Sequence, residues 1–230
     1  MYLSLENISA KYGKLLALNN INLEIEEGKI FGFIGPNGSG KTTLLRILIG
    51  LKKQKSGKIK LKGKQIKPTK TDIKKMLGYC PQENSFFDKL TVKENLKFFA
   101  ILYNVKYNLN KLSDSITKSL NLFHKINERA SNLSGGMKRR LNIGCSIVHG
   151  PKILLLDEPT IELDPFSRMA IWRLIKTINK AGTTVIVSTN SMEEANFLCD
   201  KVAFLLEGQI KYIGPPKNII KMIDDYIWSE

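Results

Sequence analysis

The chain has 230 residues, of which 43% are hydrophobic and 25% are charged, and its formal net charge is +15 at pH 7. This length is typical of one large domain, and no apolar run approaches the roughly 20 residues that a membrane-spanning helix requires. The N-terminus lacks the basic and then apolar pattern of a signal peptide, so we expect a cytosolic chain. The positive charge could attract nucleic acid or anionic lipid. Because the lysines are scattered, without an arginine-rich stripe or interleaved aromatics, we expect no specific nucleic-acid partner.

The three cysteines are Cys80, Cys145 and Cys199, and they form no CxxC pair. No histidine cluster lies near them in the sequence. We therefore expect neither a zinc site nor a disulfide framework, and we interpret the three residues as buried free thiols.

The beginning of the chain predicts β-structure. The segments YLSLENISA and INLEIEEGKI alternate as strands do. The stretch between them carries Gly13 and the paired residues Asn19 and Asn20, which predict turns. A lysine-rich segment that ends at about Lys70 is typical of a hairpin.

Farther along the chain, strand and helix patterns alternate. The segment KIFGFIGPNGSGKTTLLRILIG predicts a short apolar strand, a glycine-rich turn and a helix with one apolar side. From Asn84 to His149 the pattern is mostly helical, and Thr91 followed by Glu94 predicts a helix start. Apolar strand signals return in KILLLDEP, TTVIVST and KVAFLLEG. This order predicts a mainly parallel sheet covered on both faces, into which the helical stretch is inserted.

The stretch GPNGSGKT, Gly35 to Thr42, fits the phosphate-binding pattern GxxxxGK[ST] and lies between the predicted strand and helix. Its glycines allow backbone amides to converge on phosphate oxygens, and the helix N-terminus adds a favourable partial charge. We expect Lys41 to bind the outer phosphates and Thr42 to place its hydroxyl on Mg²⁺. The candidate phosphate-binding residues are Gly35, Pro36, Asn37, Gly38, Ser39, Gly40, Lys41, Thr42 and Thr43.

The apolar strand in ILLLDEP ends in two acidic residues. We expect Asp157 to hold Mg²⁺ through water, and Glu158 to orient and polarise the water that attacks the outermost phosphate. Apolar strands of parallel sheets often end in solvated acids. The phosphate loop in the same chain favours the catalytic interpretation.

Between these two motifs lies NLSGGMKRRLNIGCSIV. The combination resembles the nucleotide-binding subunit of ATP-binding cassette (ABC) transporters, whose signature is LSGGQ; here Met137 stands in the last place. The resemblance implies that Ser134, Gly135 and Gly136 face the nucleotide held by a second cassette. Two ATP molecules, with Mg²⁺, would then be sandwiched in a head-to-tail dimer. The bare amides at the start of the predicted helix agree with this role.

The resemblance extends from Tyr2 to about Pro216 and implies further site residues. Tyr12 stands where the family has an aromatic residue that stacks on adenine, although a tyrosine beside a turn glycine could equally be surface or core packing. Gln82 matches a glutamine that touches Mg²⁺ and senses the membrane partner, and the alternative is an exposed loop residue. Asp164 matches the loop that crosses between subunits.

The resemblance also implies the fold class. This is α/β: a P-loop NTPase core with a mainly parallel sheet, an N-terminal antiparallel β subdomain and an inserted α-helical subdomain. We expect a single ABC ATPase domain over residues 1–230. Its nucleotide-binding core would comprise residues 1–84 and 150–230, and its helical subdomain, with the signature motif, residues 85–149.

Two positions depart from the family pattern. Glu162 stands where a small residue is common, and it adds charge at the expected dimer interface. Asn190 stands where the family has a histidine that hydrogen-bonds the γ-phosphate and helps to hold the attacking water. Asparagine still donates from its amide, but it is shorter and carries no positive charge. We expect normal binding of ATP and Mg²⁺ and weakened hydrolysis, with Glu158, Asn190 and Gln82 as the catalytic residues.

The signature region and DKLTVKENLKFFAILYN look like the branch whose members export drugs, polysaccharides or lipids through a separate membrane permease. Residues 83–103 would then receive the permease, with Phe86 and Phe87 as contacts or as core residues. This would place the chain peripherally at the cytoplasmic face of the cell membrane. Two alternatives are a soluble ABC ATPase that acts on nucleic acid or ribosomes, and a degenerate nucleotide-gated subunit that pairs with a competent cassette.

Overall fold

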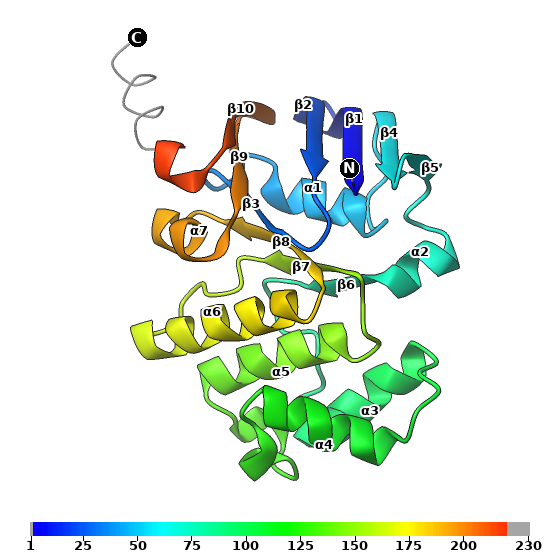
Figure 1. Cartoon of the computed structure of the whole chain (residues 1–230), viewed down its shortest axis with the longest axis vertical. Coiled ribbons are helices and arrows are strands. Elements are labelled where there is room, and N and C mark those ends of the chain that lie inside the picture. Colours follow the sequence, from blue (N-terminus) through cyan, green and yellow to red (C-terminus); the bar gives the residue numbers. More distant parts are fainter. Residues whose placement is uncertain (1, 220–230) are drawn as a thin grey trace.

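The computed structural model describes residues 2–219, which form two β-sheets and the helices packed on them (Figure 1). In Figure 1 the N-terminal sheet lies at one end of the molecule, helices α3 and α4 lie at the other, and the second sheet lies between them. The predicted end of the nucleotide-binding core at residue 230 lies outside the described residues. Within residues 2–219, no helix combines the length and apolar character needed to cross a bilayer.

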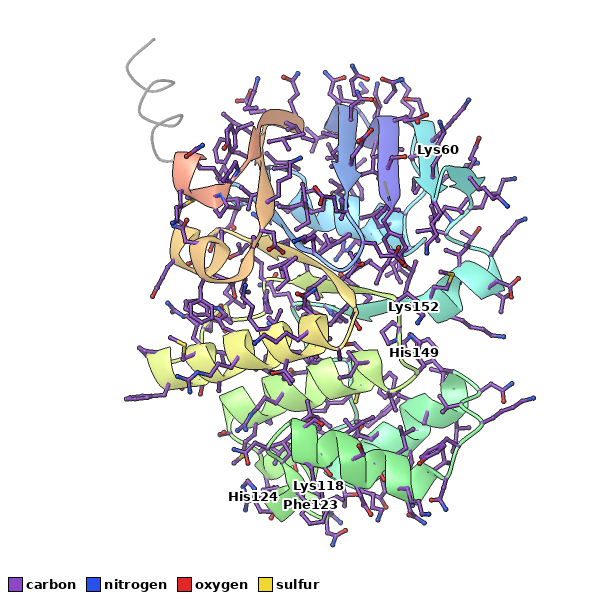
Figure 2. The ribbon with its side chains drawn as sticks, in the orientation of Figure 1. Lys60, Lys118, Phe123, His124, His149 and Lys152 are labelled. Atoms are coloured by element: carbon purple, nitrogen blue, oxygen red, sulfur yellow. The ribbon has the colours of Figure 1, made fainter. Side chains whose placement is uncertain are left out.

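The first sheet is antiparallel, in the order β2-β1-β4-β5. Its strands are β1 (Leu3–Tyr12), β2 (Leu15–Ile25), β4 (Ser56–Leu61) and β5 (Lys64–Ile66). The pairing of β4 with β5 confirms the lysine-rich hairpin. Lys60 on β4, labelled in Figure 2, forms an ion pair with Glu6 on β1, with 2.5 Å between Nζ and Oε1.

One predicted turn is wrong. Asn19 and Asn20 lie inside β2, and the chain does not reverse there. Asn20 has φ 54° beside an irregularity in the register with β1, and its amide N donates to Ser9 Oγ at 3.0 Å. An asparagine tolerates this left-handed conformation, so it forms a bulge within the strand instead of ending it.

The second sheet is mainly parallel, in the order β10-β9-β3-β8-β7-β6. Its strands are β3 (Ile30–Ile34), β6 (Leu77–Cys80), β7 (Ile153–Asp157), β8 (Thr184–Thr189), β9 (Lys201–Leu206) and β10 (Gln209–Gly214). Only β10, paired with β9, runs antiparallel to its neighbour. Strands β3, β7 and β8 are buried along their whole length. This confirms the predicted sheet, covered on both faces.

The helices are α1 (Lys41–Leu48), α2 (Thr71–Met76), α3 (Val92–Leu102), α4 (Leu109–Ser119), α5 (Gly135–Ile147), α6 (Pro165–Lys180) and α7 (Met192–Leu198). Helix α1 lies between the two sheets, whereas α5, α6 and α7 lie on the other side of the second sheet (Figure 1). The short helix α2 was not predicted, because it buries none of its residues and so has no apolar stripe.

The second sheet supplies side chains to two hydrophobic cores. Along β7, Ile153 and Leu155 pack in the core that contains α1, while Leu154 and Leu156 pack in the core that contains α5 and α6. This division follows from the alternation of side chains across a strand. The three cysteines are buried and free, as predicted.

His149, which follows α5, joins the helical segment to the second sheet (Figure 2). Its ring stacks on Tyr103, at the end of α3, with 3.8 Å between the ring centroids and 6° between the planes. Its Nε2 lies 3.1 Å from the carbonyl oxygen of Leu77, the first residue of β6. Burial lowers the pKa of His149, so the neutral ring is favoured in this contact.

Helix α3 begins with the capping box that the sequence predicts. The Thr91 side chain accepts a hydrogen bond from the Glu94 amide at 3.1 Å, and the Glu94 carboxylate accepts one from the Thr91 amide at 2.8 Å. We expect Thr91→Ala to lower the free energy of unfolding by about 1 kcal/mol, because one amide of the first turn loses its partner. Denaturant unfolding measures this loss. Thr177→Ala is the control, since the exposed Thr177 hydroxyl bonds only a carbonyl of its own helix; an equal loss in both variants would contradict the capping role.

Candidate functional site

A cavity of about 600 Å³ opens at the carboxyl ends of β3, β6, β7 and β9. Ligands bind at this edge in open parallel sheets. The predicted site residues that line the cavity are Tyr12, Asn37, Gly38, Gly40, Lys41, Thr42, Thr43, Gln82 and Glu158. Six further lining residues were not predicted: Leu15, Leu16, Ala17, Ile161, Glu207 and Gly208. The adjacent leucines Leu15 and Leu16, close to Tyr12 in the sequence, were the available signal for an apolar wall. Both are exposed in the structure.

The loop between β3 and α1 requires glycine for steric reasons. Gly38 has φ 82° and Gly40 has φ 108°, conformations that L side chains rarely adopt. A Cβ on Gly40 would lie 2.7 Å from the Leu18 side chain and 2.9 Å from the Ala17 carbonyl oxygen. Gly40 is also the N-cap of α1, and no side chain caps this helix. The first amides of α1 are therefore available to a phosphate.

Lys41, the first residue of α1, holds a buried ammonium group in this loop. Its Nζ donates to the carbonyl oxygens of Gly35 at 2.7 Å and Pro36 at 3.1 Å, and lies 3.4 Å from Glu158 Oε1. Only 5% of Lys41 is exposed. A buried cation of this kind requires acceptors on several sides, and phosphate oxygens could supply them.

Asp157 ends β7, and its carboxylate accepts hydrogen bonds from three hydroxyl groups. Its Oδ1 accepts from Thr42 Oγ1 at 3.0 Å and from Ser188 Oγ at 2.5 Å, and its Oδ2 accepts from the Tyr79 hydroxyl at 3.3 Å. Burial and the nearby Asp157 charge raise the pKa of Tyr79 to about 12, so Tyr79 remains a donor. The structure thus brings the predicted metal ligands Thr42 and Asp157 into contact.

Glu158 follows Asp157 in a strained conformation. Its φ is 47°, and its amide N lies 3.1 Å from both the carbonyl oxygen and the hydroxyl of Ser188. Its Oε2 accepts a hydrogen bond from the backbone N–H of Asn190 at 3.3 Å. Burial raises the pKa of Glu158, and the Lys41 charge partly opposes this rise. The turn after β8 therefore positions this carboxylate beside Lys41 and Asn190.

The signature residues Ser134, Gly135 and Gly136 form a turn at the start of α5, the signature turn, that lies beside the loop with Asp164. Neither segment lines the cavity. Ser134 is the N-cap of α5, and Asp164 is the N-cap of α6 and accepts from the Ser167 amide at 2.9 Å. A Cβ on Gly136 would lie 2.4 Å from Ser167 Oγ, so glycine is required for this close approach. Ser134 and Asp164 are exposed.

Two buried residues of α5 connect the signature helix to the cavity, and sequence reasoning did not identify them. Arg139 donates to the carbonyl oxygens of Pro81 at 2.9 Å and Glu158 at 2.8 Å. Asn142 donates to Glu83 at 3.1 Å and accepts from the Ser85 hydroxyl at 2.6 Å. These bonds attach the loop of Gln82 and the acidic end of β7 to α5.

The comparisons with known proteins agree on one family. A protein-family model described as ABC transporter matches residues 18–161. The linearmycin resistance ATP-binding protein LnrL of Bacillus subtilis (strain 168) is 36% identical over 218 residues, which cover 94% of this chain and 70% of LnrL. The chain belongs to the ABC transporter family. It is an ATP-binding cassette, and the family hydrolyses ATP.

Other ABC proteins resemble this cassette. ATP-binding cassette sub-family A member 2 of Rattus norvegicus is 41% identical over 207 residues, covering 90% of this chain but only 8% of that protein. The solved structure of cbiO1 from Clostridium perfringens, part of the ABC transporter complex cbiONQ, has 30% identity and a TM-score of 0.87, covering 96% of this chain and 91% of that one. The dimeric cassette MJ0796, bound to ADP and Pi, has 28% identity and a TM-score of 0.83, covering 93% and 98%. The structural matches confirm the predicted fold class.

Besides Asp157 and Glu158, the cassette contains a third buried acid near the site, Glu194 on α7. Its Oε1 accepts from Thr160 Oγ1 at 2.7 Å and from Trp172 Nε1 at 2.8 Å. Glu194 thus joins the loop after β7 and α6 to α7, and its amide N donates to Ser191 Oγ, next to Asn190, at 3.2 Å.

We expect Glu194→Ala to lower the free energy of unfolding by about 2–5 kcal/mol, because it leaves two buried donors without an acceptor and creates a cavity. Glu194→Gln keeps an oxygen at this position and should cost less than half as much. Thermal or denaturant unfolding of both variants compares these losses. Equal destabilisation by the two substitutions would show that hydrogen bonding at Oε1 is not what stabilises this junction.

Proposed function

We propose that this cassette binds ATP and Mg²⁺ in the cavity at the strand ends and works as the ATP-hydrolysing subunit of an exporter. The observation that carries this proposal is the buried Lys41 ammonium, which lies among the Gly35 and Pro36 carbonyls and Glu158, next to the contact between Thr42 and Asp157. These groups match the charges of a triphosphate and of a divalent cation.

A triphosphate that enters the loop receives the amides at the start of α1 and gives Lys41 anionic partners. The ammonium then exchanges its contact with Glu158 for phosphate oxygens. This exchange releases the Glu158 carboxylate, which can orient and polarise the attacking water. The strained backbone of Glu158, held by Ser188, keeps the carboxylate at the cavity wall.

The side-chain oxygens at this site fit a Mg²⁺ ion that is bound together with the nucleotide. The Thr42 hydroxyl and the Asp157 carboxylate are 3.0 Å apart, and Gln82 lines the same cavity. No cluster of three or more His, Cys, Asp or Glu residues that could hold a metal occurs in residues 2–219, so phosphate oxygens and water would complete the coordination. Mg²⁺ would supply neutralisation of the charge that develops on the phosphates.

Residues 85–149 are proposed to form the helical subdomain that contacts a permease, with the cassette at the cytoplasmic face of the membrane. Phe87, Phe98, Ile101 and Leu102 are exposed apolar residues in this region, and the rings of Phe87 and Phe98 are in contact. Phe86 is buried in the core and is therefore not a docking residue. The relative LnrL is named for linearmycin resistance, which supports export. The similar structure cbiO1 is part of an ABC transporter complex, which supports a permease partner.

A second cassette is proposed to complete the site. Ser134, Gly135, Gly136 and Asp164 lie outside the cavity that contains Lys41, so within one chain the signature turn does not contribute to that cavity wall. The dimeric form of the similar cassette MJ0796 supports this arrangement. The exposed charge of Glu162 would lie at the same interface.

Asn190 is proposed to weaken hydrolysis while leaving ATP binding intact. We expect Asn190→His to raise the steady-state rate of ATP hydrolysis by about 10²–10³, because a donor near the transferred phosphate is restored. The Kd for ATP should change less than threefold, and Glu158→Gln should abolish hydrolysis in both backgrounds. Phosphate release and calorimetric titration measure the two quantities.

The exposed Asn196 on α7 provides the matched control. Asn196→His introduces the same side chain away from Glu158 and should leave the rate unchanged. A rate that does not rise in Asn190→His would refute the proposed role of Asn190. If the wild-type cassette does not bind ATP, or if Lys41→Ala binds ATP as tightly as the wild type, the proposed function itself is refuted.

A further inference from the structure

The aromatic ring of Tyr12 has a lysine ammonium on one face. Lys52 Nζ lies 3.8 Å from the centroid of this ring. Tyr12 lines the cavity and is 43% exposed, whereas Lys52 does not line the cavity. The ammonium thus occupies one face of the ring and leaves the opposite face for a ligand.

Lys52 is held in this position from two sides. Its amide N donates to the Arg46 carbonyl oxygen at 3.0 Å, so the backbone of Lys52 is fixed to the last turn of α1. Its Nζ also donates to the Lys11 carbonyl oxygen at 2.8 Å, in the peptide that precedes Tyr12. Lys52 thus connects the helix of the phosphate loop to the end of β1, where Tyr12 begins the turn at Gly13.

A cation within about 6 Å of a ring centroid is attracted by the negative face of the ring. This attraction, together with the bond to the Lys11 carbonyl, fixes the Tyr12 ring in one orientation. A ring that is already ordered stacks on a flat ligand at a smaller entropic cost than a mobile ring.

We propose that Lys52 is a positioning residue for the base of the nucleotide, acting through the Tyr12 ring. The inference rests on the proposed function, in which the cassette binds ATP and Tyr12 stacks on adenine. Lys52 acts on the base and not on the phosphates, because its ammonium is directed to the ring and to a backbone carbonyl. The phosphate loop and the base platform are thereby coupled through α1.

Calorimetric titration of the full chain with Mg²⁺ and either ATP or inorganic triphosphate tests this role. We expect Lys52→Gln to weaken ATP binding about 3- to 10-fold, the range that corresponds to the cost of ordering one side chain on binding. Binding of inorganic triphosphate should change less than twofold. Lys52→Arg keeps a cation over the ring and should retain most of the affinity for ATP.

Two further variants separate the ring from the charge. In a Tyr12→Ala background, Lys52→Gln should have no additional effect on ATP binding, because the ring through which Lys52 acts has been removed. Lys53→Gln removes the same charge from an exposed neighbouring position and should leave both affinities unchanged.

Equal weakening of ATP and inorganic triphosphate by Lys52→Gln would overturn the inference, since Lys52 would then act as a charge for the phosphates. An undiminished effect in the Tyr12→Ala background, or no effect on ATP in either background, would also overturn it. If the wild-type chain binds inorganic triphosphate but gains no affinity from the base, the stacking role of Tyr12 fails. If it binds neither ligand, the proposed function fails, and this inference with it.

Discussion

The buried ammonium of Lys41 is the constraint on which the rest of the site depends. A cation that is 5% exposed must be surrounded by acceptors, because burial of an unpaired charge is costly. The protein provides two loop carbonyls and the Glu158 carboxylate. The glycine conformations of the loop and the strained backbone at Glu158 are the means by which these acceptors converge. The same convergence makes the site suitable for an anion with several oxygens, and it places the acid that would activate water within reach of that anion.

The topology of the second sheet explains how distant parts of the chain reach this point. Strands β3, β8 and β7 are neighbours, so the phosphate loop, the turn at Ser188 to Asn190 and the acidic pair meet at one edge. Arg139 on α5 extends the arrangement to the signature helix, because it bonds the carbonyls of both Pro81 and Glu158. A shift of α5 would therefore be transmitted to the loop of Gln82 and to Glu158. Arg139 thus provides a physical link between the helical segment and the site.

The parts of the fold and the site that could be predicted from the sequence are those with local chemistry. The glycines and Lys41 follow from the demands of phosphate binding, and the acids at the end of β7 follow from an apolar strand that reaches the sheet edge. The capping box at Thr91 is also local. The roles of Arg139, Asn142 and Ser188 could not be predicted, because their partners lie 19 to 61 residues away in the chain. The turn expected at Asn19 was wrong because tertiary pairing with β1 continues the strand through a bulge. Burial of Phe86 beside the exposed Phe87 likewise depends on tertiary packing.

The central proposal is that the phosphate loop of one chain and the signature turn of another chain bind the same triphosphate. The most direct measurement is ATP hydrolysis by a mixture of two inactive variants. Lys41→Ala removes the loop charge and keeps the signature turn, whereas Ser134→Glu keeps the loop and places a repelling charge on the signature turn. Each variant alone should be inactive, and their mixture should regain activity, since one intact composite site forms in each mixed dimer. Full activity of Ser134→Glu alone, or a mixture no more active than its components, would contradict the account.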